Sequence, residues 1–215
     1  MKQGGVDWRN SGKVTPVRDQ AQCGSCWAFG SVAATESLIL QKTTKYTSSN
    51  LDLSEQEVVD CAVGNKCNGG STYNGLSYIQ KSGITTEANY PYKAVAGTCK
   101  KYTKVARVGG IKTHTDKNEN TLVSVVNSYV TTVGIDASKS SFQLYKSGIY
   151  NEPRCSTSTI DHTVTVVGYG DNYFIVKNSW GTSWGEKGYI KMTKNGSNQC
   201  CIACYVVYPT TVSLL

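Results

Sequence analysis

Residues 19–30 read DQAQCGSCWAFG, and the chain continues as SVAATESLILQK up to residue 42. After Ser25, apolar side chains recur at the spacing of an α-helix. They are Phe29, Val32, Ala33 and Leu40, with Leu38 and Ile39 in the last turn. Cys26 begins this predicted helix, where unpaired backbone N–H groups and the helix dipole stabilise a thiolate. The stretch therefore predicts a long helix that starts at a reactive cysteine, with a buried or bridged structural cysteine as the alternative.

A histidine and an asparagine in the second half of the chain are candidate partners for this thiol. His162, one of only two histidines, opens the apolar stretch DHTVTVVGYG (161–170). An imidazole is costly in a packed strand unless a partner binds it, and a core histidine with satisfied hydrogen bonds is the alternative. Asn178 ends another predicted strand, in KNSWG (177–181). In a Cys–His–Asn arrangement, His162 accepts the proton of Cys26 and the amide oxygen of Asn178 holds the ring in one tautomer.

The cysteine content is high for a cytosolic protein. Nine cysteines occur in 215 residues, at positions 23, 26, 61, 67, 99, 155, 200, 201 and 204. This content indicates disulfides formed in an oxidising compartment, or a metal site. Cys23-x-x-Cys26 and Cys201-x-x-Cys204 resemble the halves of a four-sulfur zinc site, but they lie 178 residues apart, against about 15–20 in ribbon-type sites. A thioredoxin-like redox pair would need a preceding βαβ pattern, and no such pattern leads into Cys23. The odd number of cysteines favours at least one free thiol.

Composition and charge exclude several classes of protein. With 39% hydrophobic and 17% charged residues, the chain is predicted to fold as one compact unit or as two small lobes. No apolar run approaches the roughly 18 residues of a membrane span, and no signal peptide is recognised. The net charge is +7, but the lysines are scattered, so we expect a solvated surface and not a nucleic-acid-binding stripe.

The hydrophobic period changes along the chain from helical to strand-like. In the first half, the capping box Ser54-x-x-Glu57 opens a short helix, with the Glu57 carboxylate reaching back to the cap. Another helix runs from about Tyr73 to a left-handed C-cap at Gly83. The second half has a helical stretch around 118–130 and short predicted strands at 132–137, 162–170, 172–178 and 188–193. This order predicts an α+β chain with two lobes, divided near residues 110–116.

Nine sequence blocks carry a resemblance that covers essentially the whole chain. They are VDWR (6–9), DQAQCGSCWAFG (19–30), LSEQEVVDC (53–61), CNGG (67–70), YPY (90–92), VGIDA (133–137), FQLYKSGIY (142–150), DHTVTVVGYG (161–170) and KNSWGTSWGEKGYIKM (177–192). The sequence resembles the papain family of cysteine peptidases, and its cathepsin L-like branch in particular. In that family's signature, His and Asn follow the cysteine by about 130–150 residues. Here they follow Cys26 by 136 and 152 residues.

The resemblance implies a papain-like α+β fold in which residues 1–215 form a single peptidase unit. A helical lobe is expected over about residues 10–112 and a lobe with an antiparallel, β-barrel-like sheet over about 113–208. Both termini cross over, and the active-site cleft lies between the lobes. No insertion resembles the occluding loops of exopeptidase branches, so the resemblance favours an endopeptidase.

The resemblance also implies roles for the residues of the cleft. Cys26 matches the nucleophile, His162 the general base and later acid, and Asn178 the residue that orients the imidazole. Gln20 matches the side chain that stabilises the oxyanion together with the backbone amide of Cys26. Trp180 matches the indole that shields the Asn178–His162 hydrogen bond from water. A surface glutamine and a core tryptophan are the alternatives for the last two.

The family's main specificity pocket, which receives the residue two places before the scissile bond, departs here from the usual pattern. Its expected lining is Ser71, Thr72, Gly134, Ile160 and Tyr205, and Asp161 and Trp180 are also expected to bind substrate. Ser71 and Thr72 replace a bulky apolar wall, and Tyr205 shortens the pocket at its floor. We therefore expect a preference for small or medium aliphatic residues. Gly69 and Gly70 are expected to bind an extended substrate as an added strand.

Other positions follow from the resemblance. The family disulfides map to Cys23–Cys67, Cys61–Cys99 and Cys155–Cys200. Cys201 and Cys204 are outside the usual pattern, and a local bridge, two buried thiols, or competition between Cys201 and Cys200 for Cys155 all stay open. Glu36 is expected to be a buried structural partner of Glu55. Ala21 stands where glycine is common.

We expect protein or peptide substrates, a monomer, and inhibition by a pro-segment and by cystatin-like proteins. No cofactor, metal, nucleic acid or membrane partner is expected. Since such enzymes are made with a pro-segment, Met1 is interpreted as an artificial start, and the expected location is a lysosome-like acidic vesicle or the outside of the cell. The sequon Asn195-Gly196-Ser197 favours the same locations. The rival interpretations are a catalytically silent relative that binds partners and a zinc-stabilised module.

Overall fold

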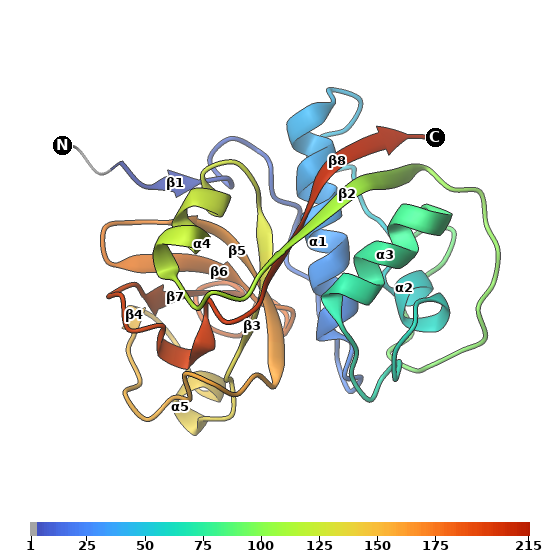
Figure 1. Cartoon of the computed structure of the whole chain (residues 1–215). Coiled ribbons are helices and arrows are strands. Elements are labelled where there is room, and N and C mark those ends of the chain that lie inside the picture. Colours follow the sequence, from blue (N-terminus) through green and yellow to red (C-terminus); the bar gives the residue numbers. More distant parts are fainter. Residues whose placement is uncertain (1–3) are drawn as a thin grey trace.

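One mixed sheet and six helical segments make up residues 4–215, the part of the chain that the computed structural model describes (Figure 1). The helices are α1 (Cys26–Lys42), α2 (Glu55–Cys61), α3 (Thr72–Ser82), α4 (Glu119–Val126), α5 (Ser140–Gln143) and the 3₁₀ helix η1 (Gln199–Cys201). The strands are β1 (Val6–Asp7), β2 (Ala106–His114), β3 (Thr131–Ile135), β4 (Ile149–Tyr150), β5 (His162–Tyr169), β6 (Tyr173–Lys177), β7 (Tyr189–Thr193) and β8 (Val206–Leu214). The fold class is α+β, as predicted. Met1, interpreted above as an artificial start, lies outside the described residues.

The sheet is open at both ends. Its strands pair in the order β2-β8-β3-β5-β6-β7-β4, and β1 pairs with β5 beside this path. Within the predicted fold the sheet is mixed, because β4 pairs with β7 in parallel, and its path does not close into a barrel. At one end of the path, β2 and β8 pair with each other and extend together across the helices (Figure 1).

Sequence analysis predicted neither β2 nor β8. β2 contains Gly109-Gly110 and β8 contains Pro209, and both residue types usually weaken or interrupt a strand. The ladder accommodates them because its register shifts between Val108 and Gly110 and again before Ile111, as in a β-bulge.

Helix α1 lies between two hydrophobic cores. The core of the helical half, which comprises α1, α2 and α3, contains Trp27, Val32, Val58, Leu76 and Ile79. The core of the sheet half contains Leu122, Phe142, Val164, Phe174 and Ile190. Since α1 packs against β5 and β8 as well as α2 and α3, every residue from Trp27 to Leu40 except Ala33 is buried. The helix predicted from the spacing of its apolar residues is confirmed, and it is buried nearly all round.

The start of α2 follows its sequence signal only in part. The Ser54 hydroxyl accepts a hydrogen bond from the amide of Glu57 at 3.0 Å, as predicted. The Glu57 carboxylate does not reach back to the cap, because the amide of Ser54 already donates to the carbonyl oxygen of Thr85. It accepts instead from the Thr85 amide and the Tyr78 hydroxyl and pairs with Lys104.

Two other predicted helix ends are close to those observed. α3 ends at Ser82, and Gly83 follows with a φ of 75°. Its ψ of 179° places it outside the left-handed helical region that was predicted. The helical stretch predicted around 118–130 is shorter, since α4 ends at Val126.

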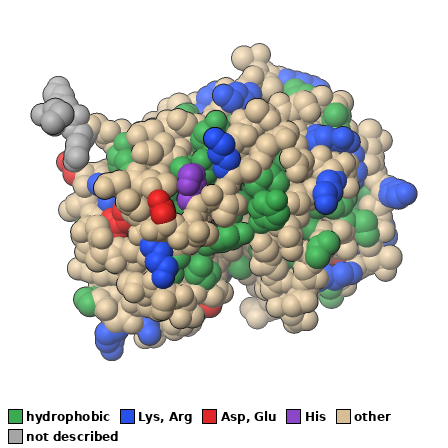
Figure 2. Space-filling view, in the orientation of Figure 1, with side chains coloured by type: hydrophobic (Ala, Val, Ile, Leu, Met, Phe, Trp, Pro, Cys, Tyr) green, Lys and Arg blue, Asp and Glu red, His purple; other side chains and the backbone are tan. Residues whose placement is uncertain are grey.

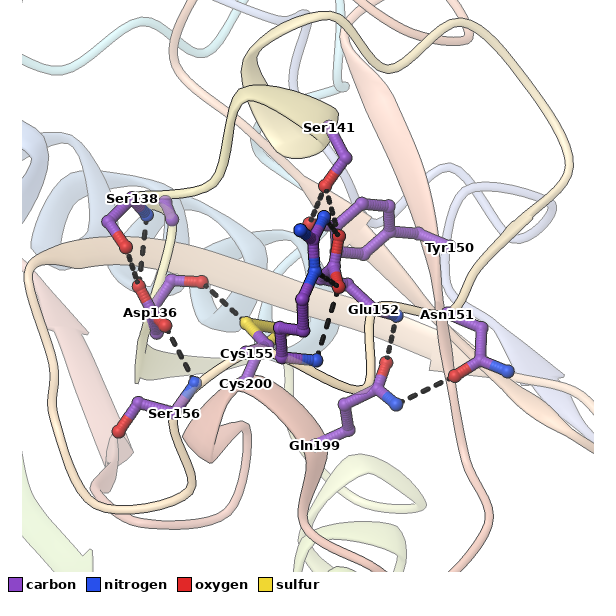
Figure 3. The surroundings of a disulfide bond; sticks show 12 residues. Asp136, Ser138, Ser141, Tyr150, Asn151, Glu152, Cys155, Ser156, Gln199 and Cys200 are labelled. Carbon is purple, nitrogen blue, oxygen red and sulfur yellow. Dashed lines mark hydrogen bonds and ion pairs between the residues drawn. A yellow bond between two sulfur atoms is a disulfide. The ribbon is translucent and has the colours of Figure 1, made fainter.

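Four disulfides join loops around both halves. The pairs Cys23–Cys67, Cys61–Cys99 and Cys155–Cys200 are those that the resemblance implied. Cys201 and Cys204 form a local bridge, which selects one of three open alternatives. Around Cys155–Cys200, Asp136 accepts a hydrogen bond from the amide of Ser156, so polar contacts reinforce this bridge (Figure 3).

Surface and helix lengths complete the description. No helix within residues 4–215 is both long and apolar enough to cross a membrane. Lys and Arg side chains are dispersed over the face drawn in Figure 2, in keeping with the scattered lysines of the sequence.

Replacing Ala21 by glycine is expected to stabilise the protein. Ala21 has a φ of 50°, in the left-handed region that disfavours residues with a Cβ. Relief of about 1–2 kcal/mol of steric cost exceeds the conformational entropy that glycine loses, so Ala21→Gly should add about 0.5–1 kcal/mol to the free energy of unfolding. Urea unfolding of both proteins measures this difference in the free energy of unfolding. As the control, Ala28→Gly in buried helix α1 should lower stability by about 1 kcal/mol or more, and a loss of stability in Ala21→Gly would contradict the prediction.

Candidate active site

Cys26 is the first residue of α1 and the one cysteine among residues 4–215 that forms no disulfide. The first N–H groups of a helix have no partner within it, so the Cys26 amide is an available donor at the start of α1. Ser25, the N-cap residue, makes no side-chain capping bond. The helix therefore presents a thiol and an available backbone donor at the same place.

His162 and Asn178 are brought to this thiol by neighbouring strands. His162 begins β5, and Asn178 directly follows β6, which pairs with β5. Nε2 of His162 donates to Oδ1 of Asn178 at 2.8 Å. The same oxygen accepts from the amide of Ser179 at 2.8 Å, which fixes the orientation of the Asn178 side chain. His162 is 7% exposed, so its imidazole is largely shielded from water.

Electrostatics favour the ion pair of thiolate and imidazolium. Burial raises the pKa of the Cys26 thiol, but the hydrogen bond and charge of His162, with smaller contributions from Thr163, outweigh it and leave this pKa below the ordinary value. Burial lowers the pKa of His162, but the hydrogen bond and charge of Cys26, followed by Asn178 and Asp161, raise it above its ordinary value. Each group thus stabilises the charged form of the other.

An aromatic cluster covers the imidazole. The Trp180 ring lies 4.9 Å from that of His162, centroid to centroid. Phe142 packs against Trp180 at 5.5 Å and His162 at 6.4 Å, and Trp184 packs against Trp180 at 5.4 Å. Sequence analysis singled out Trp180 alone. In the sequence, Phe142 and Trp184 look like any other large apolar residue that is buried in a core.

Gln20 is buried beside the nucleophile. Its Nε2 donates to the carbonyl oxygen of Cys23 at 3.0 Å, and its Oε1 accepts from the Ser179 hydroxyl at 2.7 Å. The Gln20 amide also donates to the carbonyl oxygen of Ser179 at 2.8 Å. These bonds orient a side-chain NH₂ group whose second proton is available to a ligand. Ser179 was missed by sequence analysis.

The residues of the expected specificity pocket come from both halves. Ile160 covers Gly134, since a Cβ there would lie 2.5 Å from Cγ2 of Ile160. The Gly134 amide donates to the carbonyl oxygen of Tyr205 at 3.1 Å, so these three residues meet. Ser71 and Thr72 belong to the helical half, as N-cap and first residue of α3. The Asp161 carboxylate accepts from the amide of Ala137 at 2.8 Å, beside His162.

The glycine pair before α3 has room for an approaching chain at one position. Nothing lies within 4 Å of a Cβ built on Gly69, whose φ is 106°. A Cβ on Gly70 would lie 2.4 Å from the Trp27 ring, so the backbone of residue 70 rests directly on that indole. The space beside Cα of Gly69 is thus open, although its carbonyl oxygen accepts from the Asn65 amide at 2.9 Å, while Gly70 is fixed by packing.

Three buried charged groups lie behind the Cys–His–Asn set. Glu36 accepts from the Thr15 hydroxyl at 2.5 Å and the Leu53 amide at 2.8 Å, and Lys177 directly precedes Asn178. Burial raises the pKa of Glu36, although the charge of Lys177 opposes this. Burial also raises the pKa of Glu55, and the negative charge of Glu36 adds to the increase. Glu36 and Glu55 both line the small cavity at this point, but the hydrogen bonds of Glu36 go to Thr15 and Leu53.

The zinc alternative does not fit this arrangement. Cys23 is bonded to Cys67, and Cys201 is bonded to Cys204, so three of the four sulfurs are already in disulfides. Within residues 4–215 no group of three or more His, Cys, Asp or Glu side chains is placed to hold a metal ion.

Known proteins show the same sequence pattern and fold. The family model for papain family cysteine proteases matches residues 3–210. Cysteine proteinase 3 of Entamoeba histolytica is 45% identical over 98% of this chain and 69% of its own length. Cathepsin L of Sarcophaga peregrina is 45% identical over 95% of this chain, which spans 63% of that relative.

Two solved structures agree over nearly their full length. The bromelain protease of Ananas comosus, in complex with the E64 inhibitor, has a TM-score of 0.89 and 41% identity, covering 96% of this chain and 98% of its own. A cysteine protease of Carica candamarcensis, in complex with E-64, has a TM-score of 0.88 and 40% identity, with the same coverage. The chain therefore belongs to the papain family of cysteine proteases, as a cathepsin L-like member.

Proposed function

We propose that the protein is a cysteine endopeptidase that hydrolyses peptide bonds through Cys26, His162 and Asn178. The observation that carries the proposal is the placement of a free thiol against an imidazole whose other nitrogen donates to Asn178 at 2.8 Å. Family membership supports the same reaction. The two lobes of this peptidase unit correspond to the helical half and the sheet half, with the cleft between them.

The thiolate of Cys26 attacks the carbonyl carbon of the scissile bond and forms a C–S bond. His162 then donates its proton to the leaving amine as the C–N bond breaks, which leaves a thioester on Cys26. Water, deprotonated by His162, attacks the thioester, the C–S bond breaks, and the carboxylic acid product leaves. Asn178 holds the ring in the orientation that both proton transfers need.

The negative charge on the carbonyl oxygen is stabilised by two donors. One is the Nε2 group of Gln20, which Ser179 and Cys23 orient, and the other is the backbone amide of Cys26. Donors fixed before the reaction need no reorganisation in the transition state. Trp180 and Phe142 exclude water from the His162–Asn178 bond and so strengthen it.

The substrate is a protein or peptide that binds in extended form along Gly69 and Gly70. Ser71, Thr72, Gly134, Ile160 and Tyr205 receive the side chain two places before the scissile bond, and Asp161 and Trp180 contact the chain near the reacting carbonyl. Tyr205 packs against the core of the helical half, and we assign its ring to the pocket floor. This arrangement supports a preference for small or medium aliphatic side chains.

We further propose that the protein is located in an acidic vesicle or outside the cell. We propose that it is a monomer, and that a pro-segment and cystatin-like proteins inhibit it. Four disulfides support an oxidising route of synthesis. Asn195 and Ser197 of the sequon are exposed, in keeping with a glycosylated loop. Immunolocalisation against markers of acidic vesicles tests the location, and a diffuse cytosolic signal would contradict it.

Cys26→Ala is expected to abolish hydrolysis of an unfolded protein substrate under reducing conditions, because the nucleophile is lost. The wild-type protein should cleave within the chain and should be inactivated by E-64 at one molecule per protein, as judged by mass spectrometry. Cys26→Ala should retain the wild-type unfolding midpoint and take up no E-64. A wild-type protein that binds peptides without cleaving them would instead support the catalytically silent alternative.

Alkylation of Cys26 by iodoacetamide should reveal the ion pair. Because the pKa of the thiol is lowered by His162, wild-type reactivity should persist below about pH 8, where an ordinary thiol is mostly protonated. His162→Ala should move the alkylation midpoint to higher pH, since burial is then opposed only by the smaller contributions of Thr163. The other histidine gives a matched control: His114→Ala should leave the midpoint unchanged. Reactivity of the wild-type protein confined to pH values above about 8 would contradict the ion pair.

A peptide library varied two places before the scissile bond tests the pocket. Hydrolysis of Val or Leu substrates should exceed that of Phe substrates by about tenfold in kcat/KM, the usual effect of limited pocket volume. Tyr205→Ala should reduce this difference by opening the floor. A clear wild-type preference for Phe would show that the pocket assignment is wrong.

A further inference from the structure

Tyr92 joins the two chain segments that carry the oxyanion donors. Its hydroxyl donates to the carbonyl oxygen of Gln20 at 2.7 Å and lies 2.7 Å from Oγ of Ser25, the residue before Cys26. A phenol has one proton, and a carbonyl oxygen only accepts, so the Ser25 hydroxyl is the donor in the second bond. One side chain thus connects the backbone of Gln20 with the start of α1.

The bond from Ser25 explains an unusual helix start. Serine at an N-cap normally accepts a hydrogen bond from an amide in the first turn. Ser25 makes no such bond, although it is fully buried, and its hydroxyl is directed to Tyr92. The start of α1 is therefore positioned from outside the helix, and the amide of Cys26, as the first of the helix, has no partner within it.

Tyr92 is itself held firmly. Its amide donates to Oε1 of Glu87 at 2.7 Å, and its ring meets Phe29 edge to face at a centroid distance of 4.9 Å. Burial raises the pKa of Tyr92, so the hydroxyl keeps its proton at neutral pH. The bonds of Gln20 to Ser179 and Cys23 orient its side chain, whereas Tyr92 is the side chain that holds its backbone carbonyl.

We propose that Tyr92 is a positioning residue for the oxyanion site, where its hydroxyl fixes the separation between the Gln20 side chain and the Cys26 amide. This inference rests on the proposed peptidase function. Tyr92 touches neither the substrate nor the reacting atoms, and it acts through Gln20 and Ser25. Because the donors must match the oxyanion closely, a small shift of either segment slows the reaction.

Tyr92→Phe removes both hydrogen bonds and retains the ring against Phe29. We expect kcat for peptide hydrolysis to fall about tenfold with little change in KM, because donors that act in the transition state are displaced. The matched control is Tyr90→Phe, two residues earlier. Its hydroxyl bonds to Asp60 and Thr98, away from the thiol, so this variant should lose stability without losing kcat.

Two further measurements separate positioning from a general structural role. The rate and pH profile of Cys26 alkylation by iodoacetamide do not involve an oxyanion, so Tyr92→Phe should leave both unchanged. In a Gln20→Ala background, where one donor is already absent, Tyr92→Phe should have less than about a threefold further effect on kcat. The full chain is used for every variant, and unfolding midpoints are measured alongside.

The outcomes differ for each explanation. Normal hydrolysis by Tyr92→Phe, a parallel loss of alkylation and hydrolysis, or an undiminished tenfold effect in the Gln20→Ala background would each overturn the positioning role. Absence of Cys26-dependent hydrolysis by the wild-type protein would overturn the proposed function, and the inference with it.

Discussion

The contact between the Cys26 thiol and the His162 imidazole joins the two halves of the molecule, and its geometry depends on how α1 packs against the sheet. Cys26 begins α1 and His162 begins β5, so the packing of these two elements sets the separation of the reacting groups. The approach is close: a Cβ on Gly30, one turn after Cys26, would lie 2.9 Å from Cγ2 of Thr163. A side chain there would displace the helix that carries the thiol from the strand that carries the imidazole.

Buried charges behind the site add a second constraint on the same packing. Lys177 ends β6 directly before Asn178, and Glu36 lies in α1, so their interaction spans the two halves. Burial lowers the pKa of Lys177 while Glu36 and Glu55 raise it. Removing one partner of such a group leaves an uncompensated buried charge and commonly costs about 3–5 kcal/mol. We interpret this cluster as a structural element that aligns β6, and therefore Asn178, with α1.

The features predicted best from the sequence are those for which the local hydrophobic pattern and the chemistry of the residues agree. The helix that starts at Cys26, the strand that starts at His162 and the Ser54 cap all follow from residue types within a few positions of each other. β2 and β8 were missed because their stability comes from each other and from the helices below, not from their glycine- and proline-containing sequences. Ser179 and Tyr92 could not be found at all, since a serine or tyrosine hydroxyl acquires its partner only when distant segments meet. The function of Cys26, by contrast, needed the family resemblance to distinguish it from eight cysteines that form disulfides.

The side chains of Cys26, His162 and Asn178 and the proposed specificity pocket are held by different parts of the structure. Cys26, His162 and Asn178 are fixed by α1, β5 and β6, which form the centre of both cores. The pocket floor at Tyr205 follows η1 and the Cys201–Cys204 bridge, a segment in which Asn198, Cys200 and Cys201 all have positive φ. This segment is attached to β3 by bonds from Asp136 to Cys200 and from Gly134 to Tyr205. Buried side chains take part in this attachment as well, since Cys200, Ile202 and Ala203 pack in the same core as Val133 and Ile135 of β3. The Cys201–Cys204 bridge therefore lies beside the proposed pocket floor, while Cys26 and His162 are held by α1 and β5.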